Sequence, residues 1–277
     1  MKTLKIVVAM LFFLCVGVRL QAQANAPQGA FPAGMFQGDF RKYVGGNPNS
    51  QVYSWEGLIG ADIALYRKGK HTVYTDVYSQ TIGARTLHSR INLAGTSYRF
   101  GLRYEYALNS IVHIELGAEH LSSHRAEDLR IVQNRLQRPF PEVDTGDLNI
   151  IFWGADLRFD ALPFEPRATV RIQPMSFSGL RFHRGLSGYD RPLYLATEVV
   201  LWKGHEKRIV IATKHEVGWH HFHDYAARLE LFAKDQREGR FQLFIGGSPG
   251  EGIYVSINDG WRRDGLYTGF RIVFGGR

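Results

Sequence analysis

Alternation of apolar and polar residues with a period of two constrains the fold of this chain more than any motif does. From Tyr98 to Tyr106 every second residue is aromatic or Leu, and the residues between them are Arg, Gly and Glu. The pattern follows again from Val112 to Glu119 and returns from Leu266 to Phe274. A period of two places successive side chains on opposite faces of a β-strand. No convincing helical period follows residue 24, so the sequence predicts an all-β fold.

The lengths and spacing of the alternating segments favour a membrane barrel. Eleven segments are expected as strands: 56–66, 70–80, 96–107, 110–120, 147–159, 166–174, 192–202, 207–217, 224–235, 240–247 and 264–274. Several reach the ~9 to 11 residues that a tilted membrane-spanning strand needs. The connections alternate between long and short, as in barrels with long external loops and short periplasmic turns.

Strand number and the orientation of the faces follow from this reading. Because bacterial single-chain barrels have even strand numbers, a further strand is expected between Gly34 and Tyr53. The predicted fold is therefore an antiparallel transmembrane β-barrel of about twelve strands, or of ten if segment 166–174 or 240–247 is not a strand. The charged face carries both signs and is expected to fill the interior, while the apolar face meets lipid. A soluble β-sandwich, with the apolar face buried, is the alternative architecture.

Aromatic residues gather toward the ends of the expected strands. The ones assigned to interfacial girdles are Tyr66, Tyr78, Tyr98, Tyr106, Trp153, Phe159, Trp202, Tyr225 and Phe274. Such girdles mark the two membrane–water interfaces of outer-membrane barrels.

The N-terminus has the order of a secretory signal peptide. A thirteen-residue apolar run, Ile6 to Val18, follows two lysines and precedes the small residues around Ala22. We expect residues 1–22 to be the signal peptide, 23–55 a lead with the expected first strand, and 56–277 the remainder of the barrel. Cleavage removes three basic residues and lowers the formal net charge from +8 to +5. The expected location is the outer membrane of a Gram-negative bacterium, with membrane lipid rather than nucleic acid as partner.

The only cysteine, Cys15, lies within the expected signal peptide. A mature chain without thiols has no disulfides, no cysteine metal ligands and no thiol nucleophile.

The densest polar cluster runs from Glu119 to Asp128. His120 and Ser122 continue the face assigned to lipid, which places a hydroxyl and an imidazole beside the outer leaflet. A serine and a histidine within hydrogen-bond reach, with a carboxylate that orients the imidazole, are the minimum for acyl transfer. The candidate catalytic residues are His120 and Ser122, and the candidate binding residues are Ser123, His124, Glu127 and Asp128. The structural alternative is a polar strand end that enters a loop.

The His-x-Ser pair resembles the outer-membrane lipid A deacylases, in which a histidine and a serine two residues later act with a glutamate. The resemblance implies His120 as base and Ser122 as nucleophile, and assigns no acid. Those enzymes are eight-stranded barrels with an Asn after the Ser, whereas here Ser123 follows.

A second resemblance covers most of the mature chain. The segments 98–102, 119–124 and 246–252 resemble an uncharacterised family of outer-membrane barrels that has a His-[Leu/Ile]-Ser-Ser-His segment and a Ser-Pro turn before the last strand. This resemblance implies fold and location but no reaction. Gly246 and Gly247 are accordingly expected in a turn.

Histidines form the other dense polar group, between His215 and His223. His220 and His223 could approach one metal ion, but a metal site needs three or four convergent ligands. We therefore expect neither a metal nor a cofactor. The sequence favours a barrel with a structural, binding or small-solute passage role, with a solute in the lumen as a further partner, over catalysis. The alternative is a lipid A or phospholipid acyl hydrolase that uses Ser122 and His120.

Overall fold

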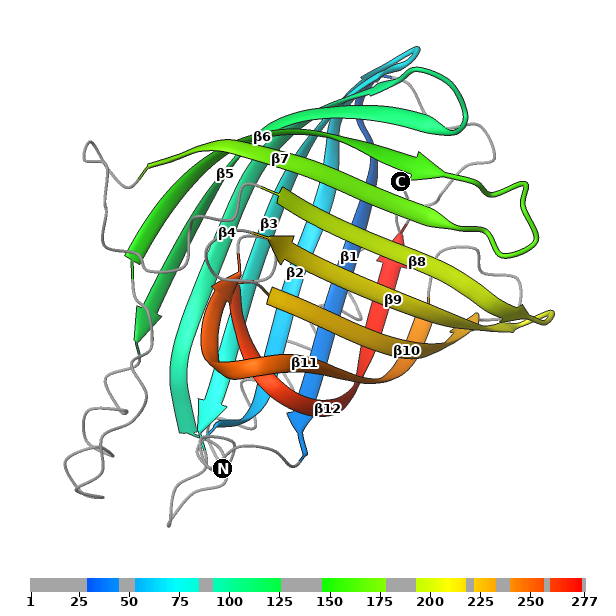
Figure 1. Ribbon diagram of the computed structural model, residues 1–277. Coiled ribbons are helices and arrows are strands. Elements are labelled where there is room, and N and C mark those ends of the chain that lie inside the picture. The colour runs from blue at the N-terminus through cyan, green and yellow to red at the C-terminus, as the bar shows by residue number, and fades with distance from the viewer. Residues whose placement is uncertain are drawn as a thin grey trace, which may run out of the picture.

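The computed structural model describes residues 29–44, 53–84, 92–125, 146–177, 193–217, 222–232, 240–256 and 260–275. The strands are β1 Gly29–Tyr43, β2 Tyr53–Lys68, β3 His71–Ala84, β4 Asn92–Ala107, β5 Val112–Arg125, β6 Gly146–Arg158, β7 Arg167–Phe177, β8 Leu193–Lys203, β9 Lys207–Val217, β10 Phe222–Phe232, β11 Arg240–Ser256 and β12 Gly260–Gly275. Each strand pairs antiparallel with the next, and β1 pairs with β12 to close the barrel (Figure 1). Twelve strands are thus confirmed. A closed barrel also excludes two stacked sheets.

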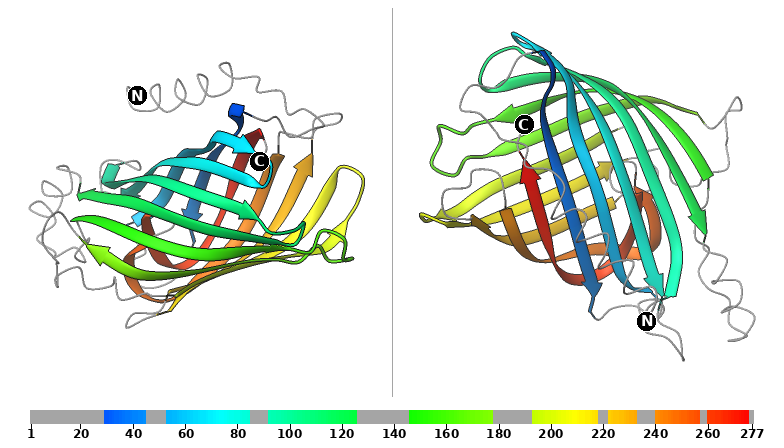
Figure 2. Two further views of the ribbon diagram at one scale, coloured as in Figure 1. Left: turned by 90° about the horizontal axis from the view of Figure 1, so that it is seen from above. Right: turned by 180° about the vertical axis from the view of Figure 1, so that it is seen from behind.

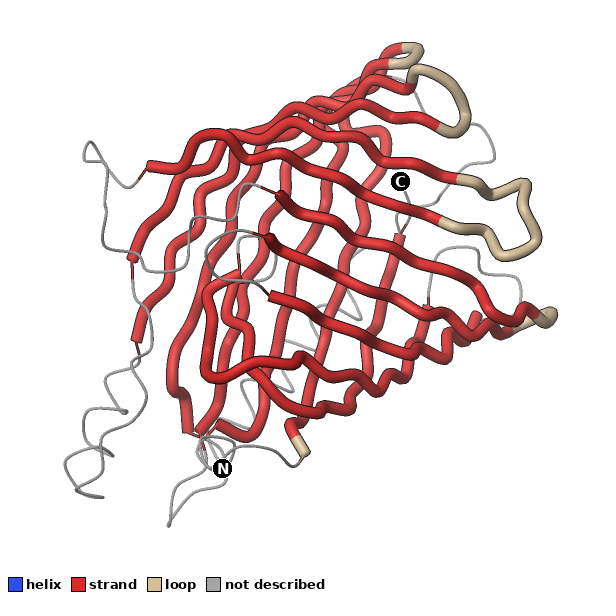
Figure 3. The backbone as a smooth tube through the Cα atoms, viewed as in Figure 1, coloured by secondary structure: helices blue, strands red, loops and turns tan. Residues whose placement is uncertain are grey.

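The strands meet in short turns at the end of the barrel where β1 begins. Residues 69–70, 108–111, 159–166 and 204–206 connect β2–β3, β4–β5, β6–β7 and β8–β9 at this short-turn end (Figure 3). Connections such as 126–145 and 178–192 join strands at the opposite end, which is called the long-connection end below. The expected alternation of connection lengths holds for these pairs. The parts of the chain that are described contain no helix long and apolar enough to cross a membrane.

The first strand begins earlier than the sequence predicts. It runs over Gly29–Tyr43, whereas Gly34 to Tyr53 was expected to contain it. Gly29 and Ala30 already pair with β2, and the register shifts between Ala30 and Ala33. These residues, which were expected in the flexible lead, are therefore part of the barrel wall. The expected signal peptide lies outside the described residues.

The expected turn at Gly246 to Gly252 is wrong. This segment lies within β11, and the β11–β12 pairing passes over it by a register shift between Ser248 and Ile253. Proline has no N–H to donate and is tolerated at such irregularities, so Pro249 does not end the strand. Strand β11 continues to Ser256 and β12 begins at Gly260. Most of the expected loop over 248–263 is therefore strand.

The two faces of the wall have the expected chemistry. Leu102, Leu116 and Leu266 point outward and are 56%, 53% and 60% exposed. Charged side chains fill the inner face in pairs: Arg103 lies 3.4 Å from Glu115, and the Nε of Arg171 donates to the other oxygen of that carboxylate at 3.1 Å. The wall that surrounds them is seen from above and from behind in Figure 2.

One predicted girdle residue is on the wrong face. Tyr78 is 7% exposed and points inward, where the guanidinium carbon of Arg99 lies 4.2 Å from its ring centroid. Tyr78 is two residues from Asp76 on β3, so both side chains point inward. Tyr66, Tyr98, Trp153, Trp202, Tyr225 and Phe274 are exposed on the outward face as expected.

Candidate active site

Four polar side chains meet on the outward face of β5 and β6, near the long-connection end. His120, Ser122 and His124 occupy alternate positions of β5, and Asn149 of β6 lies directly opposite His120 in the register. These four residues are called the rim cluster below. Alternation explains the arrangement, because the three β5 residues continue the face that carries Leu116.

Asn149 fixes the orientation of the His120 ring. The Nδ1 of His120 lies 2.9 Å from the Oδ1 of Asn149. An amide oxygen only accepts, so in this bond Nδ1 carries the proton and donates. The lone pair of the ring is then on Nε2, which is the tautomer that a general base needs.

The Ser122 hydroxyl is bonded to a different histidine from the one the sequence predicts. Ser122 is 8% exposed, and its Oγ is hydrogen-bonded to the Nε2 of His124. His120 and His124 are both two residues from Ser122 on the same face, and the hydroxyl is bonded to His124. The His124 ring is in turn tilted against Tyr98, with 6.0 Å between centroids.

Ser123, another predicted binding residue, does not join the rim cluster. Ser123 points to the inner face, is 3% exposed, and its Oγ has no hydrogen-bond partner among the described residues. Ser123 is therefore not part of an outward site, because neighbouring residues of a strand face opposite sides. Glu127 and Asp128 lie outside the described residues.

The histidine group on β9 and β10 forms a pair. The Nδ1 atoms of His215 and His223 are 2.9 Å apart, and the Nε2 of His215 is 3.1 Å from the Oγ1 of Thr213. His220 lies outside the described residues. No group of three or more His, Cys, Asp or Glu side chains suited to a metal ion occurs in the described ranges.

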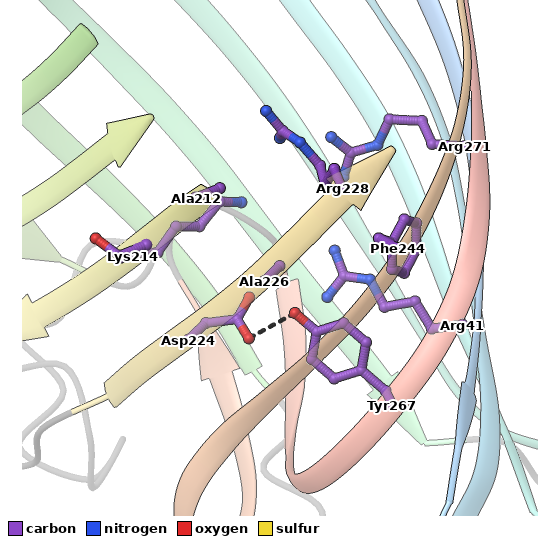
Figure 4. A pocket seen from close by; sticks show the side chains of 10 residues that line it. Arg41, Ala212, Lys214, Asp224, Ala226, Arg228, Phe244, Tyr267 and Arg271 are labelled. Atoms are coloured by element: carbon purple, nitrogen blue, oxygen red, sulfur yellow. Dashed lines mark hydrogen bonds between the residues drawn. The ribbon is translucent and has the colours of Figure 1, made fainter. Parts of the chain in front are cut away.

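A cavity that the sequence analysis did not predict lies on the inner wall. It measures about 40 Å³ and is bounded by side chains of β1 and of β9 to β12 (Figure 4). Arg41, Lys214, Arg228 and Arg271 line it together with the carboxylate of Asp224, which accepts a 2.7 Å hydrogen bond from the Tyr267 hydroxyl. Strands β9 to β12 follow one another along the chain, and barrel closure places β1 beside β12.

Asn149 was not among the site residues predicted from the sequence. Asn149 lies two and four residues before Ile151 and Trp153, so the period of two predicts that it shares their outward face. Its pairing with His120 was not predictable, because the twenty residues between β5 and β6 leave the strand register undetermined from sequence.

Solved structures of outer-membrane barrels resemble this one, whereas no protein-family model and no curated protein matches the chain. Outer membrane phospholipase A from Escherichia coli aligns over 92% of this chain and 95% of its own, at 11% identity and a TM-score of 0.55. A variant of that enzyme, in which an active-site asparagine is replaced by alanine, aligns at 10% identity, with the same coverage and a TM-score of 0.56. The KdgM porin aligns over 88% and 98% at 10% identity, with a TM-score of 0.46. The likeness to the phospholipase establishes the fold of an outer-membrane barrel.

Proposed function

We propose that this outer-membrane barrel hydrolyses acyl esters of outer-leaflet lipids at the rim cluster. Ser122 is the nucleophile, His120 is the general base, and Asn149 holds the base in place. The observation that carries the proposal is the 2.9 Å hydrogen bond between His120 and Asn149, beside a serine on the lipid-facing wall. The fold shared with a phospholipase whose active site contains an asparagine supports it.

The proposed reaction begins with a rotation of the Ser122 hydroxyl from His124 toward His120. The Oγ attacks the ester carbonyl carbon, and its proton passes to the Nε2 of His120. The imidazolium then returns the proton to the leaving alcohol, and an acyl-serine remains. Water, deprotonated by the same nitrogen, releases the fatty acid and restores Ser122. Throughout, the Oδ1 of Asn149 accepts the hydrogen bond from the Nδ1–H of His120 and keeps that proton on Nδ1.

The surroundings of the rim cluster favour a lipid substrate. Phe100 of β4 lies opposite His120, and Leu102 and Leu116 continue the outward face toward the middle of the wall, each at least half exposed. Acyl chains can lie along this apolar face while the ester reaches the polar rim. Long connections are external in outer-membrane barrels, which assigns the rim cluster to the outer leaflet. The substrate class is therefore a phospholipid or lipid A acyl ester.

The test is ester hydrolysis by the purified full chain in mixed micelles of detergent and phospholipid, and separately with lipid A. We expect Ser122→Ala and His120→Ala to lower turnover by about a thousandfold or more, since removal of a nucleophile or its base disables the whole unit. Ser123→Ala is the matched control for the serine, because it lies next in sequence but faces inward. His71→Ala is the control for the histidine, because His71 lies on β3 at the short-turn end.

The role of His124 is decided by the same assay. We expect His124→Ala to retain activity, because His124 has no orienting partner comparable to Asn149 among the described residues. Loss of activity in His124→Ala with retention in His120→Ala would assign the base to His124. Absence of turnover by the wild type would leave a structural, binding or passage role.

A further inference from the structure

Four cations converge on the inner-wall cavity. Arg41 of β1, Lys214 of β9, Arg228 of β10 and Arg271 of β12 line it, against the single carboxylate of Asp224 (Figure 4). The acids that pair with the arginines stand outside the lining: Asp39 accepts from Arg41 and Arg271, and Glu198 lies 2.8 Å from Arg228.

The guanidinium of Arg41 is held rigidly and still has free donors. It is 5% exposed, and its carbon lies 5.1 Å from the ring centroid of Tyr267 and 5.7 Å from that of Phe244. Its Nη2 donates to Asp39 at 3.3 Å, while Nη1 is 3.9 Å from Glu56, beyond hydrogen-bond distance. Both Nε and Nη1 lack an acceptor among the described residues.

Arg228 lines the same cavity and likewise combines an ion pair with an N–H donor that has no acceptor among the described residues. Its side chain is ion-paired through Nη2, and its buried Nε has no acceptor in the described part of the chain. Among the lining side chains, the buried polar atoms without a partner are therefore all N–H donors. A buried N–H donor without an acceptor destabilises the folded protein. A bound group with acceptor oxygens removes this penalty.

The size of the cavity limits that group. One water occupies roughly 10 to 15 Å³ of cavity volume. The cavity of about 40 Å³ therefore holds roughly three water-sized atoms. A carboxylate group, with three heavy atoms, meets this limit. A phosphate group, with five, extends in part into the lumen, as does the remainder of a larger solute.

We infer that the barrel interior contains a binding site for a small oxyanion, a carboxylate or phosphate group, held by Arg41, Lys214 and Arg228. The site lies on the inner wall, whereas the rim cluster lies on the outer face of β5 and β6. It therefore stands independently of the proposed hydrolysis.

The test is calorimetric titration of the full chain in an uncharged detergent, with acetate and with inorganic phosphate, at ionic strength held constant by NaCl. We expect saturable binding of one probe ion per chain. Arg41→Gln and Lys214→Gln should each weaken binding by about tenfold or more, the worth of one charge-assisted hydrogen bond. The relative affinities of the two probes identify the oxyanion preferred.

Arg158→Gln is the matched control. It removes the same charge from the inner face, but Arg158 is paired with Asp156 and Glu105 on β6 and β4, away from the cavity. We expect it to change affinity by less than about twofold, because distant charges in the wall are screened. If Arg41→Gln fails to fold, Lys214→Gln decides. Absence of saturable binding of either probe, or an equal loss in Arg158→Gln, would overturn the inference.

Discussion

At the scale of single residues, the proposed mechanism uses an amide where many serine hydrolases use a carboxylate. Asn149 faces a lipid environment, in which an ionised carboxylate without full pairing is costly. An amide oxygen accepts the Nδ1 proton of His120 without bringing a charge into that environment. Asn149 can therefore select the tautomer of the base without the desolvation cost of an acid.

This gives a prediction for Asn149. Asn149→Ala should lower kcat by about 10- to 100-fold, because a loosely held base spends less time in the reactive orientation. Asn149→Asp should retain more activity than Asn149→Ala, since a carboxylate oxygen can accept the same proton. Hydrolysis rates of the two variants beside the wild type measure this. Wild-type activity in Asn149→Ala would show that the hydrogen bond does not orient a catalytic base.

At the scale of strands, alternation predicted which segments form the wall and which face meets lipid, because both depend only on local periodicity. It did not predict where pairing continues past an irregularity. Pro249 lies within β11, although Gly and Pro there indicated a turn. The girdle assignment of Tyr78 did not follow alternation, which places Tyr78 on the inward face with Asp76, while its partner Arg99 on the next strand was not predictable. Register and cross-strand partners depend on neighbours that a single segment does not contain.

The orientation of the wall can be tested on one strand. Leu102→Arg on β4 should destabilise the barrel by about 2 to 4 kcal/mol, whereas Tyr66→Arg, at the short-turn end of β2, should cost about 0 to 1 kcal/mol. Both residues face outward and are about half exposed, so the comparison isolates depth in the membrane. Unfolding in urea from lipid vesicles measures the difference. Equal losses would contradict the assignment of Leu102 to the lipid-facing middle of the wall.

At the scale of the whole molecule, closure creates sites that no segment contains. Asp39 of β1 accepts two hydrogen bonds from Arg271 of β12, at 2.6 and 3.2 Å, so the first and last strands share an ion pair across the seam. The same closure assembles the cationic cavity from β1 and β9 to β12. The rim cluster, in contrast, lies on neighbouring strands and faces outward. The wall thus separates an outer polar site from an inner anion-binding site, and each can be altered without the other.

The most direct test of the account is covalent labelling of Ser122 by an alkyl fluorophosphonate, which reacts with activated serine hydroxyls. Intact-mass measurement of the full chain in micelles should show one adduct per wild-type chain, located by peptide mapping at Ser122, and no adduct in Ser122→Ala. Unlabelled wild-type protein, or an equal adduct in Ser122→Ala, would contradict the claim that the rim cluster is an acyl-hydrolase site.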